Sequence, residues 1–193
     1  MLKGINIRDC ESIYKYSLKE QAKINDKKCI FLSHASVDKS IVVKIGEYIK
    51  SSGFNIYLDL NDRYLQVSSV ASKPKVMTSC IQEGIAKSDY ILCIIADDAF
   101  DDKSWCIPNE IGYFNRGHKE WCVLRLSDVL SSKTPEYLKI KKNINSINEL
   151  NELLKSWNGV AIHEWTYLEQ YNKYNGLLKY SSSMHPLMGV VDS

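Results

Sequence analysis

Short apolar runs alternate along this chain with longer segments whose apolar residues recur at helical spacing. Four runs have the length and the β-branched or aromatic content of buried strands: residues 28–33, 54–60, 89–96 and 121–126. Helical segments separate these runs, and the strands are apolar on both faces. Alternation of this kind predicts an α/β fold, with a doubly wound, flavodoxin-like parallel sheet of four to five strands and flanking helices.

The predicted helices have identifiable ends. Between the first two strands, an apolar stripe follows two candidate caps, Ser36 and Asp38, and Gly53 is placed to end the helix. The stripe consists of Ile41, Val42, Ile45, Tyr48 and Ile49. A further helix is predicted over residues 76–88, although it contains Gly84 and glycine is a poor helix former.

Two extensions flank this alternating region, which we place at residues 27–145. The N-terminal extension, residues 1–26, has an amphipathic pattern that predicts a helix over 8–24. The C-terminal extension, residues 146–193, begins with another amphipathic helix at 146–157, with a serine at its cap position. Its apolar stripe consists of Ile147, Leu150, Leu153, Leu154 and Trp157. We expect that stripe to pack on the domain core.

Composition and charge exclude several classes of function. A chain of 193 residues can build one hydrophobic core with additions, and its net charge of +2 comes from scattered lysines that form no dense basic stripe for nucleic acid. The longest apolar run, residues 90–96, is far shorter than the ~20 residues that cross a bilayer. The N-terminus is too charged for a secretion signal. These features predict a cytoplasmic protein without nucleic-acid or membrane partners.

The cysteines and histidines indicate no metal centre. Six cysteines lie at positions 10, 29, 80, 93, 106 and 122, without a CxxC pair or a histidine at metal spacing. Free thiols in a reducing compartment are the favoured interpretation. The chain also lacks a Walker loop and a GxGxxG motif, so the familiar phosphate-binding loops are absent from the sequence.

Any ligand site is expected where the predicted strands end. In doubly wound sheets, ligands bind beyond the carboxyl ends of the strands, where loops lead to the helices. Three loops meet this condition: residues 33–38, 59–66 and 97–105.

Three stretches that include these loops resemble a TIR (Toll/interleukin-1 receptor) domain of the bacterial type. In residues 28–60, one strand ends in Phe-x-Ser-His and the next ends in an aromatic residue, one further residue and Asp. Residues 81–95, IQEGIAKSDYILCII, resemble the third strand of that family with the helix before it. Residues 104–114, SWCIPNEIGYF, resemble its Trp-x-x-x-Glu motif. The resemblance covers residues 27–130 in family order.

The resemblance implies an activity and a set of site residues. Enzymatic TIR domains cleave the nicotinamide glycosidic bond of NAD, and the glutamate of their motif, here Glu110, is catalytic. The residues implied in substrate binding are Phe31, Ser33, His34, Asp59 and Trp105. Residues 61–75 take the place of the loop that mediates assembly and gates the pocket in this family. NAD would be the substrate, with no cofactor required.

The chemistry of the reaction suits a single carboxylate. Breaking the ribose–nicotinamide bond develops positive charge on the sugar, which an ionised carboxylate nearby stabilises. Nicotinamide leaves as a neutral molecule, so no general acid is needed. Pro108 is favoured at a first helical position, which would set Glu110 in the first turn, where the helix dipole favours a negative charge. The alternative is that Glu110 only caps this helix.

The other candidates have structural alternatives as well. Trp105 lies five residues before Glu110, one more than in the family motif, which on a continuous helix would turn the two side chains about 140° apart. If the helix starts at Pro108, Trp105 lies in the preceding loop and can face the pocket; otherwise it is a core residue. His34 is either a substrate contact or a hydrogen-bonded loop residue, and Asp59 equally suits a turn cap.

Two functions of different class follow from the resemblance. The first is an enzyme that consumes NAD, by hydrolysis or by cyclisation to a cyclic ADP-ribose-type signal, similar to the TIR component of Thoeris antiphage defence, with a separate effector. The second is a non-enzymatic adaptor that acts through TIR–TIR assembly. A nucleoside deoxyribosyltransferase shares the layout, but its second set of acidic and amide residues is not evident. Self-association is expected in either case.

Overall fold

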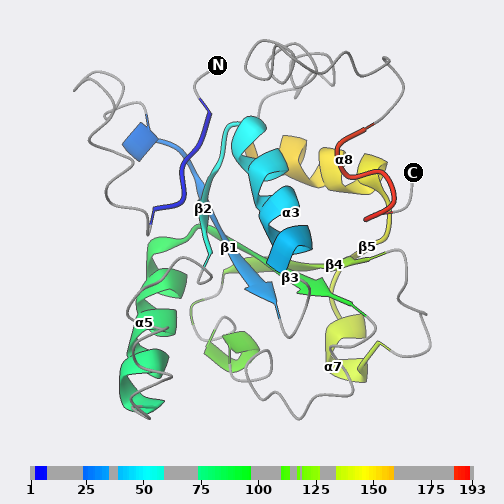
Figure 1. Ribbon diagram of the computed structural model, residues 1–193. Coiled ribbons are helices and arrows are strands. Elements are labelled where there is room, and N and C mark those ends of the chain that lie inside the picture. Colours follow the sequence, from blue (N-terminus) through cyan, green and yellow to red (C-terminus); the bar gives the residue numbers. More distant parts are fainter. Residues whose placement is uncertain are drawn as a thin grey trace.

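A five-stranded, all-parallel sheet forms the centre of the computed structural model, in the order β2-β1-β3-β4-β5 (Figure 1). The structure describes residues 3–7, 24–34, 39–58, 74–96, 110–113, 117, 119–126, 134–158 and 185–191. The strands are β1 (Cys29–His34), β2 (Asn55–Tyr57), β3 (Tyr90–Ile95), β4 (Glu120–Arg125) and β5 (Asn143–Ile144). The predicted doubly wound α/β fold is confirmed, and four of the strands are those that the apolar runs indicated.

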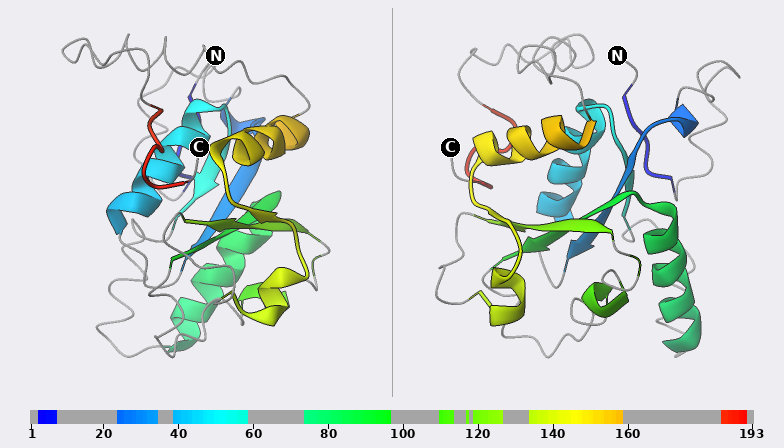
Figure 2. Two further views of the ribbon diagram at one scale, coloured as in Figure 1. Left: turned by 90° about the vertical axis from the view of Figure 1, so that its right-hand side faces the viewer. Right: turned by 180° about the vertical axis from the view of Figure 1, so that it is seen from behind.

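Helices cover both faces of the sheet (Figures 1 and 2). The helices are α3 (Lys39–Ser51), α5 (Pro74–Lys87), α7 (Glu136–Lys139) and α8 (Ile147–Asn158). Figure 2 shows α3 and α8 on one face and α5, α7 and the short helical stretch 110–113 on the other. The site predicted around Glu110 therefore lies on the α5 and α7 face.

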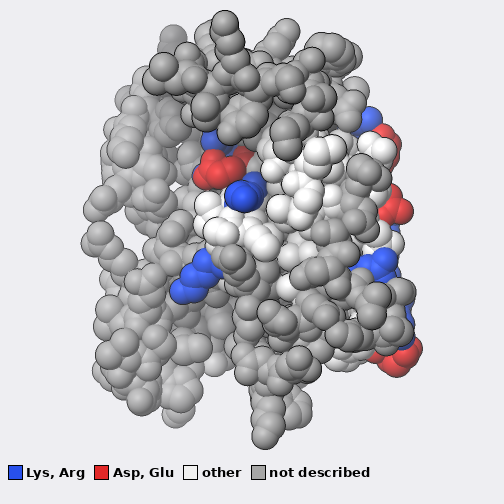
Figure 3. All heavy atoms as spheres, turned by 45° about the vertical axis from the view of Figure 1, so that its right-hand side comes forward, with Lys and Arg blue, Asp and Glu red and all other residues white. Residues whose placement is uncertain are grey.

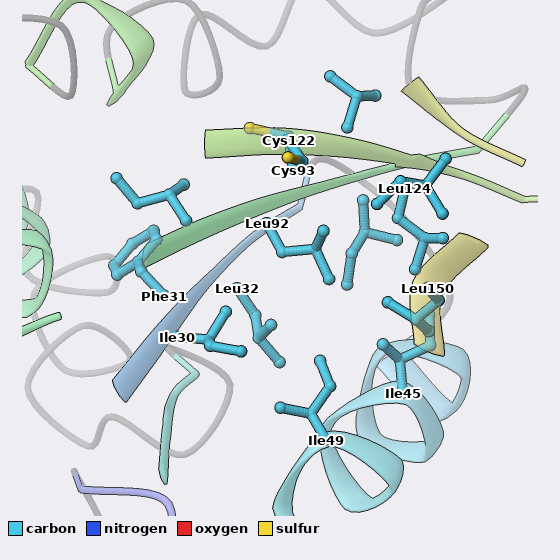
Figure 4. Close-up of a cluster of buried hydrophobic side chains, with 14 of the residues drawn as sticks. Ile30, Phe31, Leu32, Ile45, Ile49, Leu92, Cys93, Cys122, Leu124 and Leu150 are labelled. Carbon is cyan, nitrogen blue, oxygen red and sulfur yellow. The ribbon is translucent and has the colours of Figure 1, made fainter. Parts of the chain in front are cut away.

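The core between the sheet and α3 is mainly apolar. Figure 4 shows Ile30 and Leu32 of β1 pointing toward Ile45 and Ile49 of α3, with Leu92 of β3 beside them. All five side chains are at most 1% exposed, which explains why the α3 stripe could be recognised from its spacing. The helix ends as predicted, because Gly53 has a positive φ of 96° and its N–H bonds to the carbonyl oxygen of Lys50. The predicted caps, Ser36 and Asp38, lie outside the described residues.

The helix α8 joins the same core. Every residue of its predicted stripe is buried, and Ser146 caps it by accepting a hydrogen bond from the Glu149 N–H at 3.2 Å. Trp157 stacks on Tyr90 with ring centroids 4.5 Å apart and donates to Glu120 at 2.8 Å. The division into a domain at 27–145 and two extensions stays a prediction.

A segment that showed no strand pattern lies along the free edge of β2. Its backbone groups bond to β2 in parallel register: the Ile7 N–H to the Ile56 carbonyl, and the Ile56 N–H to the Ile5 carbonyl, both at 2.9 Å. A Cβ on Gly4 would lie 1.5 Å from the carbonyl oxygen of Phe54, so this close approach requires glycine. Of the helix predicted over 8–24, residues 8–23 lie outside the described part of the chain.

The unexpected glycine within α5 also has a packing reason. Gly84 is buried against the ring of Tyr57, and a Cβ there would meet the ring carbon Cζ at 2.3 Å. Glycine is thus kept in the helix, despite its poor propensity, because α5 and β2 approach closely at this point.

Candidate functional site

Glu110 is a buried carboxylate beyond the third strand. It begins the described helical stretch 110–113, and only 7% of its surface is exposed. The hydroxyl of Ser33, on β1, donates a hydrogen bond to its Oε2 atom. Ser33 is itself 1% exposed, so the contact is shielded from water. Two residues 77 positions apart in the sequence, both predicted at the site, are therefore brought together.

Cys93 is the third polar side chain at this place. It pairs with Ser33 in the parallel register of β1 and β3, so both side chains point to the same face of the sheet. Burial raises the pKa of its thiol, the negative charge of Glu110 raises that pKa further, and a hydrogen bond with Ser33 opposes the rise. Cys93 is consequently a protonated thiol at neutral pH, in electrostatic contact with Glu110.

A surface hollow adjoins the carboxylate. Its lining residues come from α5 and from the Glu110 helix: Thr78, Ile81, Gln82, Ile85, Glu110 and Tyr113. The hollow has an empty volume of about 220 Å³, part of which is open solvent. Glu110 is thus a buried carboxylate that also lines a surface hollow.

The remaining predicted site residues are placed differently. Phe31 is 2% exposed and stacks on Tyr57 with ring centroids 5.3 Å apart. His34 ends β1, is half-buried, and has Nδ1 3.4 Å from the carbonyl oxygen of Leu32. Their roles as substrate contacts stay predictions. Asp59 and Trp105 lie outside the described residues, as does the loop at 61–75.

Sequence reasoning did not single out Cys93. It treated the cysteines as free buried thiols, and for Cys29, Cys93 and Cys122 that prediction is confirmed. The other three cysteine side chains lie outside the description. The signal that would have found Cys93 is strand register: if β1 and β3 pair side by side, residues near their carboxyl ends share one face.

Charges on the surface are mixed in sign. Figure 3 shows basic and acidic side chains interspersed on the described part of one face. Several form exposed ion pairs within helices, such as Lys155 with Glu152 at 2.7 Å. Among the described residues, no three His, Cys, Asp or Glu side chains gather as a metal site requires. Within those same ranges, no helix is long and apolar enough to span a bilayer.

These features define a doubly wound α/β domain with a buried carboxylate at the carboxyl end of its parallel strands. Comparison with known families adds the identity of that domain. A family model described as TIR domain matches residues 30–156, which run from β1 to α8. The chain therefore belongs to the TIR domain family. No curated protein matches the chain in a comparison of sequences.

Proposed function

We propose that this TIR protein is an enzyme that cleaves the bond between nicotinamide and ribose in NAD, with Glu110 as its catalytic residue. The observation that carries the proposal is the buried Glu110 carboxylate, held by Ser33 beside a surface hollow. Burying a carboxylate costs free energy unless it is well compensated, and folding alone has no need of it. An adaptor that only assembles with other TIR domains would have no use for such a group.

In the proposed reaction, the glycosidic bond breaks and its electron pair goes to the nicotinamide nitrogen. Nicotinamide, positively charged in NAD, leaves neutral, and the positive charge passes to the ribose. The Glu110 carboxylate stabilises that oxocarbenium-like state, and water or a nucleophile within ADP-ribose then captures it. Capture by water gives ADP-ribose and a proton; capture by the internal nucleophile gives a cyclic ADP-ribose, which contains one water fewer.

The biological setting is also a proposal. A TIR enzyme that makes a cyclic ADP-ribose-type product could pass it to a separate effector, as in the TIR component of Thoeris antiphage defence, which the sequence resembles. NAD is the substrate and no cofactor is needed. We further propose that the protein acts in the cytoplasm and self-associates through its TIR domain, with residues 61–75 contributing to assembly.

The test is product analysis by mass spectrometry after incubation of NAD with the wild type and with Glu110→Gln, at low and high protein concentration. The neutral amide keeps the shape of the side chain but removes its charge, so nicotinamide release should fall by at least about 100-fold. A matched control is Glu83→Gln, an exposed carboxylate on α5, which should retain full activity.

The outcomes separate the two functions. Nicotinamide from the wild type and the control, but not from Glu110→Gln, supports catalysis, and the accompanying product distinguishes hydrolysis from cyclisation. If Glu110→Gln were as active as the wild type, Glu110 would not be the catalytic residue. If no protein releases nicotinamide even at high concentration, the adaptor function becomes the better explanation, and partners of residues 61–75 should be sought by pull-down.

A further inference from the structure

The N-terminal segment 3–7 runs beside β2 as far as Ile7, where the chain turns away. Its backbone bonds to both backbone groups of Ile56, as the ladder of a parallel sheet requires. Leu58 lies two residues further along β2, beyond the end of this ladder. A side chain takes over there: the Asn6 amide accepts from the Leu58 N–H at 3.2 Å and donates to the Leu58 carbonyl at 3.3 Å.

The Asn6 amide thus stands in for a strand neighbour. A side-chain amide has a carbonyl and N–H groups, as a peptide has, so it can bond to both backbone groups of one residue. Asn6 is 6% exposed and Leu58 is 2% exposed, so water is largely excluded from this contact. Because buried backbone groups without partners are costly, the carboxyl end of β2 depends on this side chain.

This end of β2 belongs to the edge at which ligands bind in doubly wound sheets. The neighbouring parallel strand, β1, carries Ser33 near the same edge, where its hydroxyl donates to Glu110. Leu58 is followed in the sequence by Asp59, a predicted substrate-binding residue that lies outside the described part of the chain. The backbone of Leu58 therefore sets the point from which the chain leaves the sheet toward Asp59.

We propose that Asn6 is a positioning residue for NAD binding, because its amide fixes the carboxyl end of β2, from which the chain continues to Asp59. The inference rests on the proposed function, since it assigns this strand end to the NAD site. Asn6 acts through the backbone of Leu58 rather than on the substrate itself. The N-terminal extension thereby contributes to the site as well as to the sheet.

A second buried asparagine, Asn55, offers a matched control at the amino end of β2. Its Oδ1 atom accepts from the Ile5 N–H at 3.1 Å, and its Nδ2 atom donates to the Ile24 carbonyl at 2.8 Å. Asn55 is 4% exposed, so it shares with Asn6 its chemistry, its burial and its contact with the N-terminal segment. It lies at the end of the strand away from the ligand-binding edge. Asn55→Ala therefore reports the cost of loosening the segment alone.

The first measurement is amide hydrogen exchange, followed by NMR, for the wild type, Asn6→Ala and Asn55→Ala. Without its acceptor, the Leu58 N–H should exchange about 10- to 100-fold faster in Asn6→Ala. In Asn55→Ala the increase should appear at Ile5 instead, with Leu58 within about threefold of the wild type. The Leu92 amide, in the central strand β3, should stay strongly protected, which shows that both variants fold. If Asn6→Ala does not fold, Asn6→Gln, which keeps the amide on a longer stem, is compared in the same way.

The second measurement is kcat and KM for nicotinamide release by the same proteins. A loosened strand end should weaken substrate binding, so Asn6→Ala should raise KM for NAD by about 10-fold with kcat within about threefold. Asn55→Ala should leave both constants within about twofold of the wild type. Glu110→Gln should instead lower kcat, so the positioning role of Asn6 can be told from the catalytic role of Glu110.

The two measurements separate this inference from the proposed function. Faster exchange at Leu58 together with a raised KM, both in Asn6→Ala alone, would support the positioning role. Faster exchange with an unchanged KM, in a protein that releases nicotinamide, would overturn that role and leave the enzyme standing. An equal rise of KM in Asn6→Ala and Asn55→Ala would also overturn it, because the segment would then have only a structural role.

A protein without activity would still test the inference. If the wild type releases no nicotinamide, the proposed enzyme fails, and the Kd of NAD, measured by calorimetric titration, takes the place of KM. Weaker NAD binding in Asn6→Ala alone would then support the positioning role. Equal binding by the wild type and both variants, or no binding by the wild type, would overturn it.

Discussion

Each end of β1 has a buried cysteine beside a buried serine, but the two serine hydroxyls donate to different kinds of acceptor. At the amino end, Cys29 contacts Ser88, whose hydroxyl donates to the backbone carbonyl of Gly84 in the last turn of α5. At the carboxyl end, Cys93 lies beside Ser33 in the register of β1 and β3, and the Ser33 hydroxyl donates to the carboxylate of Glu110. The first acceptor is a carbonyl that the helix end leaves without an intrahelical partner; the second is a charged side chain that the core has to accommodate.

Under the proposed function, this difference separates a contact that completes the fold from one that serves the candidate site. Lys119 adds to the amino end by donating to the carbonyl oxygens of Ala86, at 3.1 Å, and of Ser88. The acceptors of Ser88 and Lys119 are backbone carbonyls, and the Asp89 carboxylate accepts from the Cys29 N–H at 2.9 Å. Substitutions at the amino end should therefore lower the free energy of unfolding without changing the catalytic rate. Substitutions of Ser33 and Glu110 should instead lower the rate with little loss of stability.

The largest expected effect on stability comes from Gly84→Ala at the amino end. The new Cβ would lie 2.3 Å from the Tyr57 ring carbon Cζ, so α5 and β2 must move apart. Overpacking of this kind costs about 1–3 kcal/mol, and the better helix propensity of alanine offsets up to ~1 kcal/mol of that cost. Urea denaturation should show a net loss of up to about 2 kcal/mol.

Gly112 provides the control for that substitution. It lies in the helical stretch with Glu110, and a Cβ there would meet nothing within 4 Å. Gly112→Ala should therefore be neutral or stabilising by up to about 1 kcal/mol. A Gly84→Ala protein as stable as Gly112→Ala would mean that α5 does not pack closely on β2.

Much of this architecture could be predicted from the sequence, because it depends on local pattern. The strands β1 and β3 and the buried stripe of α8 all follow from apolar spacing within one or two residues of their observed ends. The strand β5 has only two residues, too few to show a period. The segment 3–7 pairs with β2 through backbone groups, which leave no pattern in the side chains.

The site divides along the same principle. Glu110 was found from a motif contained in a few consecutive residues. The side chains around Glu110 could not be found in this way, because the position of Ser33 beside Cys93 depends on the register of two strands about 60 residues apart in the chain. The resemblance also implies a substrate-binding role for Ser33, which stays a prediction, since a side chain that faces a ligand and one that faces another side chain look the same in a sequence.

A second prediction tests whether the amino-end thiol stays protonated. Burial is the main cause that raises the pKa of Cys29, from 9.0 to about 12. Above pH 9 the unfolded chain therefore loses this proton while the folded protein keeps it, so stability is full below pH 9 and falls as pH rises toward 12. The Cys29 contribution to the slope is about 1.4 kcal/mol per pH unit at most.

Urea denaturation between pH 8 and 10.5 measures that slope. Other groups titrate in this range, so the quantity of interest is the difference between the wild type and Cys29→Ala, which should lose stability less steeply with pH. Equal slopes for the two proteins would show that the Cys29 thiol ionises as readily in the folded state as in the unfolded chain, and the amino end would then be more open to water than its burial indicates.

The smallest expected effect concerns Lys119, which closes the end of α5 from outside. Its ammonium donates to two carbonyl oxygens near the helix C-terminus, where a positive charge also meets the negative end of the helix dipole. Lys119→Met keeps most of the aliphatic stem but removes the donors, and should cost about 0.5–1 kcal/mol in urea denaturation.

Lys87→Met, which removes an exposed pair with Glu83 on the same helix, should cost only about 0.3 kcal/mol. Neither change should alter nicotinamide release. A fall in kcat for Lys119→Met without a change in stability would show that the two ends of the sheet are coupled, and that the amino end contributes to catalysis after all.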